Sequence, residues 1–115
     1  MATKRCLIVG GRAARRRALA HLLREEGYEA RDVEGAAEAK RLVPDFVPDA
    51  VLVDADLGDA LPDLLRAVRS QRTDARVFVT RDRPTQAADA VEWADAFFDR
   101  PVNLLELRRA LEPEG

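Results

Sequence analysis

The stretch Ala50-Val51-Leu52-Val53-Asp54-Ala55-Asp56 indicates how this chain of 115 residues folds. An apolar run ends in an acid, with Pro48 just before it and Gly58 just after it. Such a run between turn-forming residues is typical of a strand buried on both faces of a parallel sheet. A carboxylate at the carboxyl end of that strand lies where open α/β sheets hold their ligands. A single acid in this place more often only ends a strand and caps a turn, so the rest of the chain must decide.

The same alternation of strand and helix continues along the chain. Short apolar or alternating runs predict strands at 6–9, 28–33, 50–54, 76–80 and 96–98. Apolar residues at helical spacing predict helices over 13–26 and 35–43, a third opened by Pro62, a fourth from Pro84 towards Trp93, and a fifth capped by Asn103. Pro44 is expected to stop the second helix. Five strands alternating with five helices predict a parallel sheet with helices on both faces.

Composition excludes several classes of protein. The 19 Lys and Arg residues nearly balance 21 Asp and Glu residues, which argues against nucleic acid as a partner of this domain. One cysteine, Cys6, and one histidine, His21, exclude disulfide frameworks and multi-histidine metal sites, and a reducing cytoplasm is the simplest setting. No apolar run approaches the length of a membrane span. We therefore expect one cytoplasmic domain over 1–115, without a membrane segment and without an output domain.

Three polar side chains are expected at one edge of this sheet. Asp54 and Thr80 end the third and fourth predicted strands, and Arg100 follows the fifth. The carboxyl ends of parallel strands share one edge, so these groups should lie together. Their convergence makes a functional role for Asp54 stronger than its position alone does.

This constellation resembles the receiver domain of bacterial response regulators, over essentially the whole chain. The resemblance implies a flavodoxin-like, three-layer, doubly wound (βα)5 sheet with strand order 2-1-3-4-5. It implies that Asp54 is the phosphoacceptor position, that Thr80 and Phe97 are the switch positions, and that Arg100, before Pro101, takes the place of the family's lysine. The implied partners are a histidine kinase, an output domain or another regulator. A homodimer through the face of the fourth helix, fifth strand and fifth helix is also implied.

The departures from the family's pattern bear on activity. Receivers carry two acids after the first strand that hold Mg²⁺, and this chain has Gly10 and Gly11 there. Mg²⁺ is usually bound through at least one or two carboxylates, so we expect weak or absent binding and no cofactor. Arg100 is a planar fork that is expected to pair with Asp54 in a bidentate way. Arg81, after Thr80, is expected to crowd the site. We therefore predict a degenerate receiver that is not an enzyme and works by protein–protein interaction without phosphorylation.

Two other interpretations involve the glycines at 10 and 11. A glycine pair between strand and helix is also typical of dinucleotide-binding domains, with Asp32 or Glu34 roughly 20 residues further on to hold a ribose. The segment resembles the start of siroheme-synthase-type NAD-binding domains, but alanines replace the later glycines. A further alternative is an anion site made by Arg12, Arg100 and the glycine amides. The run of arginines from Arg12 to Arg17 is otherwise expected to be a solvated helix face.

Overall fold

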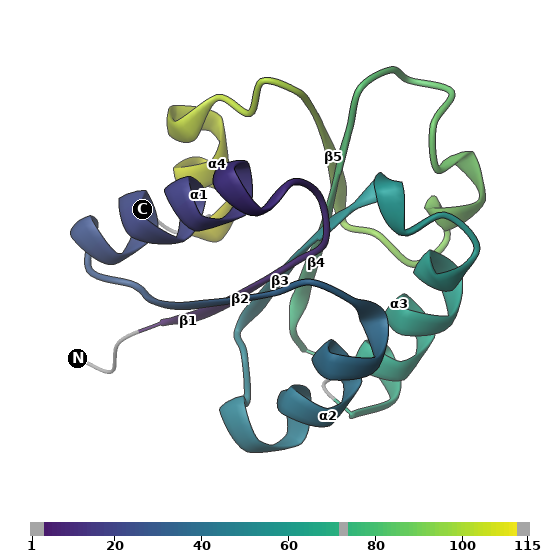
Figure 1. Cartoon of the computed structure of the whole chain (residues 1–115), viewed down its shortest axis with the longest axis horizontal. Helices are drawn as coiled ribbons and strands as arrows, with labels where there is room; N and C mark the ends of the chain where they lie inside the picture. The colour runs from purple at the N-terminus through teal and green to yellow at the C-terminus, as the bar shows by residue number, and fades with distance from the viewer. Residues whose placement is uncertain (1–3, 72–73, 113–115) are drawn as a thin grey trace.

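The computed structural model describes residues 4–71 and 74–112 and confirms the predicted fold class. A five-stranded parallel sheet has the order β2-β1-β3-β4-β5, with helices on both of its faces (Figure 1). The strands are β1 (Arg5–Val9), β2 (Glu29–Val33), β3 (Ala50–Asp54), β4 (Arg76–Arg81) and β5 (Ala96–Asp99). The α-helices of the described residues are α1 (Ala13–Glu25), α2 (Ala36–Phe46), α3 (Ala60–Gln71) and α4 (Leu104–Leu111).

The strand β3 is the centre of the sheet, and all of its residues are buried. Alternate side chains face opposite layers: Val51 and Val53 pack with α2 and α3, whereas Leu52 packs with α1 and α4. Complete burial of one such side chain contributes about 1.5–3 kcal/mol. A continuous apolar run is therefore required here, because either face of the strand is covered by helices (Figure 1).

Two prolines lie inside helices rather than at the boundaries predicted for them. α2 continues through Pro44 to Phe46, which is buried, so Pro44 does not stop the helix. α3 begins at Ala60, two residues before Pro62. A proline in the first turn has no intrahelical hydrogen bond to lose, which explains why Pro62 is tolerated. Burial of Phe46 explains why the last turn of α2 persists beyond Pro44.

The fourth predicted helix is the main error in the expected elements. Residues 84–93 form turns and one short 3₁₀ helix at Ala88–Ala90. Ala87 has the left-handed backbone conformation, with φ of 60°, and a continuous α-helix cannot pass through it. Side chains stabilise the alternative path, because Arg81 donates to the carbonyl of Pro84 and Gln86 accepts from the amide of Asp82.

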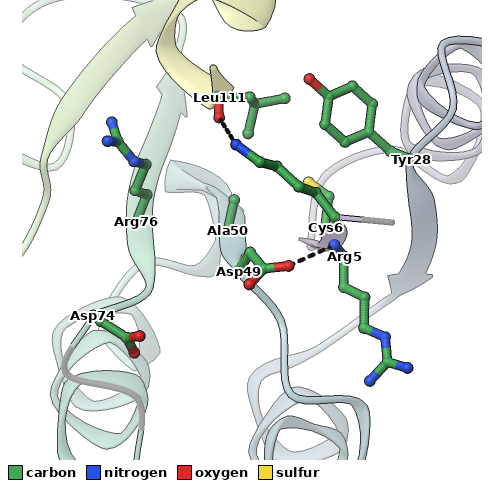
Figure 2. Close-up of a pocket in the computed structure, with 9 residues that line it drawn as sticks. Arg5, Cys6, Tyr28, Asp49, Ala50, Asp74, Arg76 and Leu111 are labelled. Atoms are coloured by element: carbon green, nitrogen blue, oxygen red, sulfur yellow. Dashed lines mark hydrogen bonds between the residues drawn. The ribbon is translucent and has the colours of Figure 1, made fainter. Parts of the chain in front are cut away.

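A small cavity of about 170 Å³ lies at the amino-terminal ends of the strands (Figure 2). Asp54 lies at the other, carboxyl-terminal end of β3. Lys4 Nζ donates to the carbonyl of Leu111, and the amide of Arg5 donates to Asp49 Oδ2 at 2.9 Å. Cys6 lines this cavity but is buried, and burial raises the pKa of its thiol to about 12. The thiol is therefore protonated and unreactive in the folded domain. Within the described residues, no helix combines the length and apolarity of a membrane span.

Candidate functional site

Asp54 ends β3 and is buried against the neighbouring strand. In the register of β3 and β4, Asp54 pairs with Thr80. Thr80 Oγ1 donates to Asp54 Oδ2 at 3.4 Å, and the amide of Asp56 donates to Asp54 Oδ1 at 2.8 Å. The second contact caps the short 3₁₀ turn Ala55–Leu57 that leaves the strand. Both interpretations of Asp54 therefore hold in part: it caps a turn, and it also faces the other polar groups of the edge.

Arg100 brings three carboxylates together at this edge. Its backbone is held beside β4, where its amide donates to the carbonyl of Arg81 at 2.8 Å. One guanidinium nitrogen, Nη1, donates to Asp54 Oδ2. Nε donates to Asp82 Oδ1 at 2.8 Å, and Nη2 lies 3.7 Å from Asp56 Oδ1. The predicted pairing with Asp54 is present, but the predicted bidentate geometry is wrong because the fork is shared among three acids.

The charge on Arg100 is stabilised although its side chain is only 8% exposed. The hydrogen bond to Asp82 is the largest cause of a raised Arg100 pKa; burial opposes it, and Asp54 adds to it. The same hydrogen bond lowers the pKa of the Asp82 carboxyl. A permanent cation is therefore fixed against Asp54 without any added ligand.

Gly10 and Gly11 pass close to Asp54 in a conformation that favours glycine. Their φ angles are +83° and +79°. A Cβ atom added to Gly11 would lie 2.6 Å from Asp54 Oδ2, and one added to Gly10 would lie 3.1 Å from Leu57 Cδ2. The glycines thus let the backbone approach the carboxylate, and any side chain at position 11 would displace it.

The site does not fit the magnesium ion that receivers hold. Glycines stand where the metal-binding acids are expected, and a guanidinium nitrogen already contacts the Asp54 oxygen. Among the described residues, no group of three His, Cys, Asp or Glu side chains is placed to hold a metal ion. Asp56 and Asp82 are near, but both carboxylates face the cation of Arg100. A second cation among these groups would have to compete with Arg100 for the carboxylates.

The side chains of Phe97 and Arg81 lie against each other and not against Asp54. Phe97 is half-buried and packs on the core layer that contains α3. The guanidinium carbon of Arg81 lies 4.3 Å from the centre of the Phe97 ring, and its Nε donates to Asp99 at 3.1 Å. The prediction that Arg81 crowds the site is therefore wrong, because Arg81 turns towards β5.

Two residues of the site were not predicted in their observed roles. Asp82 directly follows β4 and so lies at the same edge of the sheet as Asp54. This position is the feature of the sequence from which its role could have been predicted. Arg16 was assigned to a solvated face, but it is buried. Its Nε donates to Asp32 at 3.1 Å and its Nη1 to the carbonyl of Gly11 at 2.9 Å. Arg16 thereby fixes the glycine turn.

Replacing Gly11 by alanine is expected to destabilise the domain more than replacing Gly27. Both positions have positive φ, so alanine costs about 1–3 kcal/mol of backbone strain at each. A Cβ at Gly27 meets nothing within 4 Å, whereas at Gly11 it meets Asp54. We expect Gly11→Ala to cost about 1–3 kcal/mol beyond Gly27→Ala in urea unfolding. Equal losses would show that the carboxylate moves aside freely.

Comparison with known proteins gives a fold-level match. No protein-family model matches the chain, and no curated protein matches its sequence. A receiver domain from Methylobacillus flagellatus has a TM-score of 0.86 at 20% identity, with 99% of this chain and 100% of that chain covered. A receiver domain from Methanospirillum hungatei JF-1 gives 0.85 at 25% identity, with 99% and 100% covered. A Burkholderia pseudomallei response regulator with a phosphorylated aspartic acid, calcium ion and citrate gives 0.84 at 27% identity, with 94% and 66% covered.

Proposed function

We propose that this chain, whose fold is that of response regulator receiver domains, is a module of two-component signal transduction that signals without phosphorylation of Asp54. The observation that carries the proposal is the contact between Arg100 Nη1 and Asp54 Oδ2. A permanent internal cation thus holds one of the two carboxylate oxygens, and neutralisation of its charge makes this oxygen a poorer nucleophile toward a phosphoryl donor.

The electrostatics of the site support the proposal. Phosphoryl transfer depends on positioned positive charge that neutralises the transferred group, supplied mainly by metal ions and cations. The acids that would bring Mg²⁺ are replaced by Gly10 and Gly11. Arg100, which stands where the family has a lysine, is committed to Asp54 and Asp82. Asp54 therefore acts as the anionic partner of a structural ion pair in this proposal.

The proposed activity is non-enzymatic binding to a signalling protein: a histidine kinase, an output domain or another regulator in the cytoplasm. The surface around 84–93, β5 and α4 is the proposed contact region, including for pairing of two copies. Val91 and Leu105 are exposed apolar side chains of this region. It differs from the expected face because turns replace the fourth helix.

Dinucleotide binding has less support from the same residues. Asp32, one candidate for holding a ribose, is already paired with Arg16 at 3.1 Å. The carbonyl of Gly11 also accepts from Arg16, which closes the turn on itself. We therefore do not propose a nucleotide cofactor.

The test is exposure of the domain to beryllofluoride or acetyl phosphate with Mg²⁺. We expect no adduct on Asp54 by intact-protein mass spectrometry or ¹⁹F NMR, because the oxygen is held and the metal-binding acids are replaced. An Arg100→Lys variant should also stay unmodified, since Gly10 and Gly11 remain.

An Asp54→Asn variant gives the background, and a receiver domain with the acidic pair, treated in parallel, shows that the reagents are active. A stoichiometric adduct that disappears in Asp54→Asn would overturn the proposal. An adduct in Arg100→Lys alone would assign the block to the arginine and not to the missing acids.

A further inference from the structure

We propose that the groove between α1 and the segment 100–102 binds a small organic anion with an apolar body. A cavity of about 510 Å³ lies there, beside Asp54. Its volume falls within the ~300–1,000 Å³ of small-molecule sites. The inference rests on the proposed function: where Arg100 holds Asp54, a ligand bound beside the pair takes the place of a phosphoryl group as the signal.

One part of the groove is apolar. Leu19, Leu22 and Val102 line it, from α1 on one side and the segment before α4 on the other. Leu22 is 43% exposed although it lies beside this cavity. An uncovered leucine in a concave site is a surface on which an apolar body gains free energy by excluding water.

The part of the groove near the N-terminus of α1 is positively charged. Four arginines and two aspartates line the cavity, a formal excess of two positive charges; they are Arg12, Arg15, Arg16, Arg100, Asp54 and Asp82. Arg16 and Arg100 are held by internal contacts. Arg12 and Arg15 are exposed and make no ion pair or hydrogen bond through their side chains with the described residues, although the charge of Arg15 helps to lower the pKa of the Asp82 carboxyl. These two are the cations available to a ligand.

The N-terminus of α1 also favours an anion at this end. The first turn of α1 contains no acid, and its N-cap, Arg12, makes no side-chain capping bond. Its amides therefore add to the positive potential of the arginines.

The charged and apolar parts of the groove together define the chemical class of the ligand. A carboxylate, sulfonate or phosphate group is expected near Arg12 and Arg15, and an aliphatic or aromatic body against Leu19, Leu22 and Val102. An inorganic anion would use only the charged part of the groove. A neutral apolar molecule would use only the apolar part of the groove and leave the cations unpaired.

Two dyes with the same rings test this inference. 8-Anilinonaphthalene-1-sulfonate carries an anionic group, whereas N-phenyl-1-naphthylamine does not. We expect saturable one-to-one binding of the sulfonate by fluorescence titration, clearly tighter than binding of the neutral amine. Amide shifts in ¹⁵N NMR should centre on α1 and on 100–102. The Arg12→Ala/Arg15→Ala variant should bind the sulfonate about tenfold more weakly.

Arg17→Ala/Arg41→Ala is the matched control, because it removes the same charge from exposed arginines outside the cavity. Equal weakening by the two double variants, or equal binding of the two dyes, would overturn the inference. So would a concentration-dependent dimer that shifts the same amides without dye, since a second copy would then fill the groove. Near-UV circular dichroism verifies that each variant is folded. The dye results do not depend on whether Asp54 forms an adduct, so failure of either proposal is recognised separately.

Discussion

Replacing Arg100 by methionine is expected to lower the free energy of unfolding by about 3–5 kcal/mol. Methionine keeps much of the apolar stem but removes the cation, and this leaves the buried Asp54 carboxylate without its charged partner. The remaining donors to Asp54, Thr80 Oγ1 and the amide of Asp56, compensate only in part. Urea unfolding with a constant m value measures the loss.

A double-mutant cycle with Asp54→Asn shows whether this loss comes from the pair. We expect Asp54→Asn alone to cost less than Arg100→Met, because Arg100 keeps its contacts with Asp82 and Asp56. The double variant should cost less than the sum of the single variants by at least about 1 kcal/mol. The exposed pair Arg5–Glu29 is the control, with an expected coupling of about 0–1 kcal/mol. Additive losses at Asp54 and Arg100 would contradict the structural role that we assign to this ion pair.

Replacing Phe78 by alanine is expected to cost about 3–5 kcal/mol, the other large effect. Phe78 is 2% exposed on β4, and its ring meets the Phe98 ring edge-on with centroids 5.6 Å apart. The substitution leaves a cavity between the sheet and the layer of α1 and α4, and it removes the aromatic contact.

The matched control is Leu105→Ala on α4, where the side chain is 54% exposed. It should change the free energy of unfolding by no more than about 0.5 kcal/mol. A loss below about 1 kcal/mol for Phe78→Ala would mean that this layer of the core closes around the vacancy, contrary to the dense packing of protein interiors.

Elements that depend on buried apolar runs could be predicted from the sequence. All five strands and the helices α1, α2, α3 and α4 lie close to their predicted positions. The segment 84–93 differs because its alanines and Val91 do not bury enough apolar surface to enforce a helix. Val91 is exposed, and local contacts of Arg81 and Gln86 select turns instead. Pro44 was predicted to end the second helix, but α2 continues to Phe46. Burial of Phe46 outweighs the cost of a proline near the end of the helix.

Some residues of the candidate site could be predicted from the sequence, and others could not. The strand ends placed Asp54, Thr80 and Arg100 at one edge, and the structure brings them into contact. The role of Asp82 and the burial of Arg16 were not predicted. A charged residue beyond a strand or on a helix is ordinarily solvated, and only the tertiary partner shows otherwise. The roles assigned to these residues in signalling remain predictions for the experiments above.

By itself the sequence determined the parallel sheet and the edge at which Asp54 lies, because burial on two faces requires continuous apolar strands. The strand order was implied by the resemblance to receiver domains, and the structure confirms it. It also determined that glycines replace acids at positions 10 and 11. Only the tertiary structure decided which charges meet. Arg100 divides its nitrogens among Asp54, Asp56 and Asp82, and Arg12 and Arg15 line an open groove. Side-chain charges have no periodic pattern along the chain, and their pairing follows from the three-dimensional positions of segments far apart in sequence.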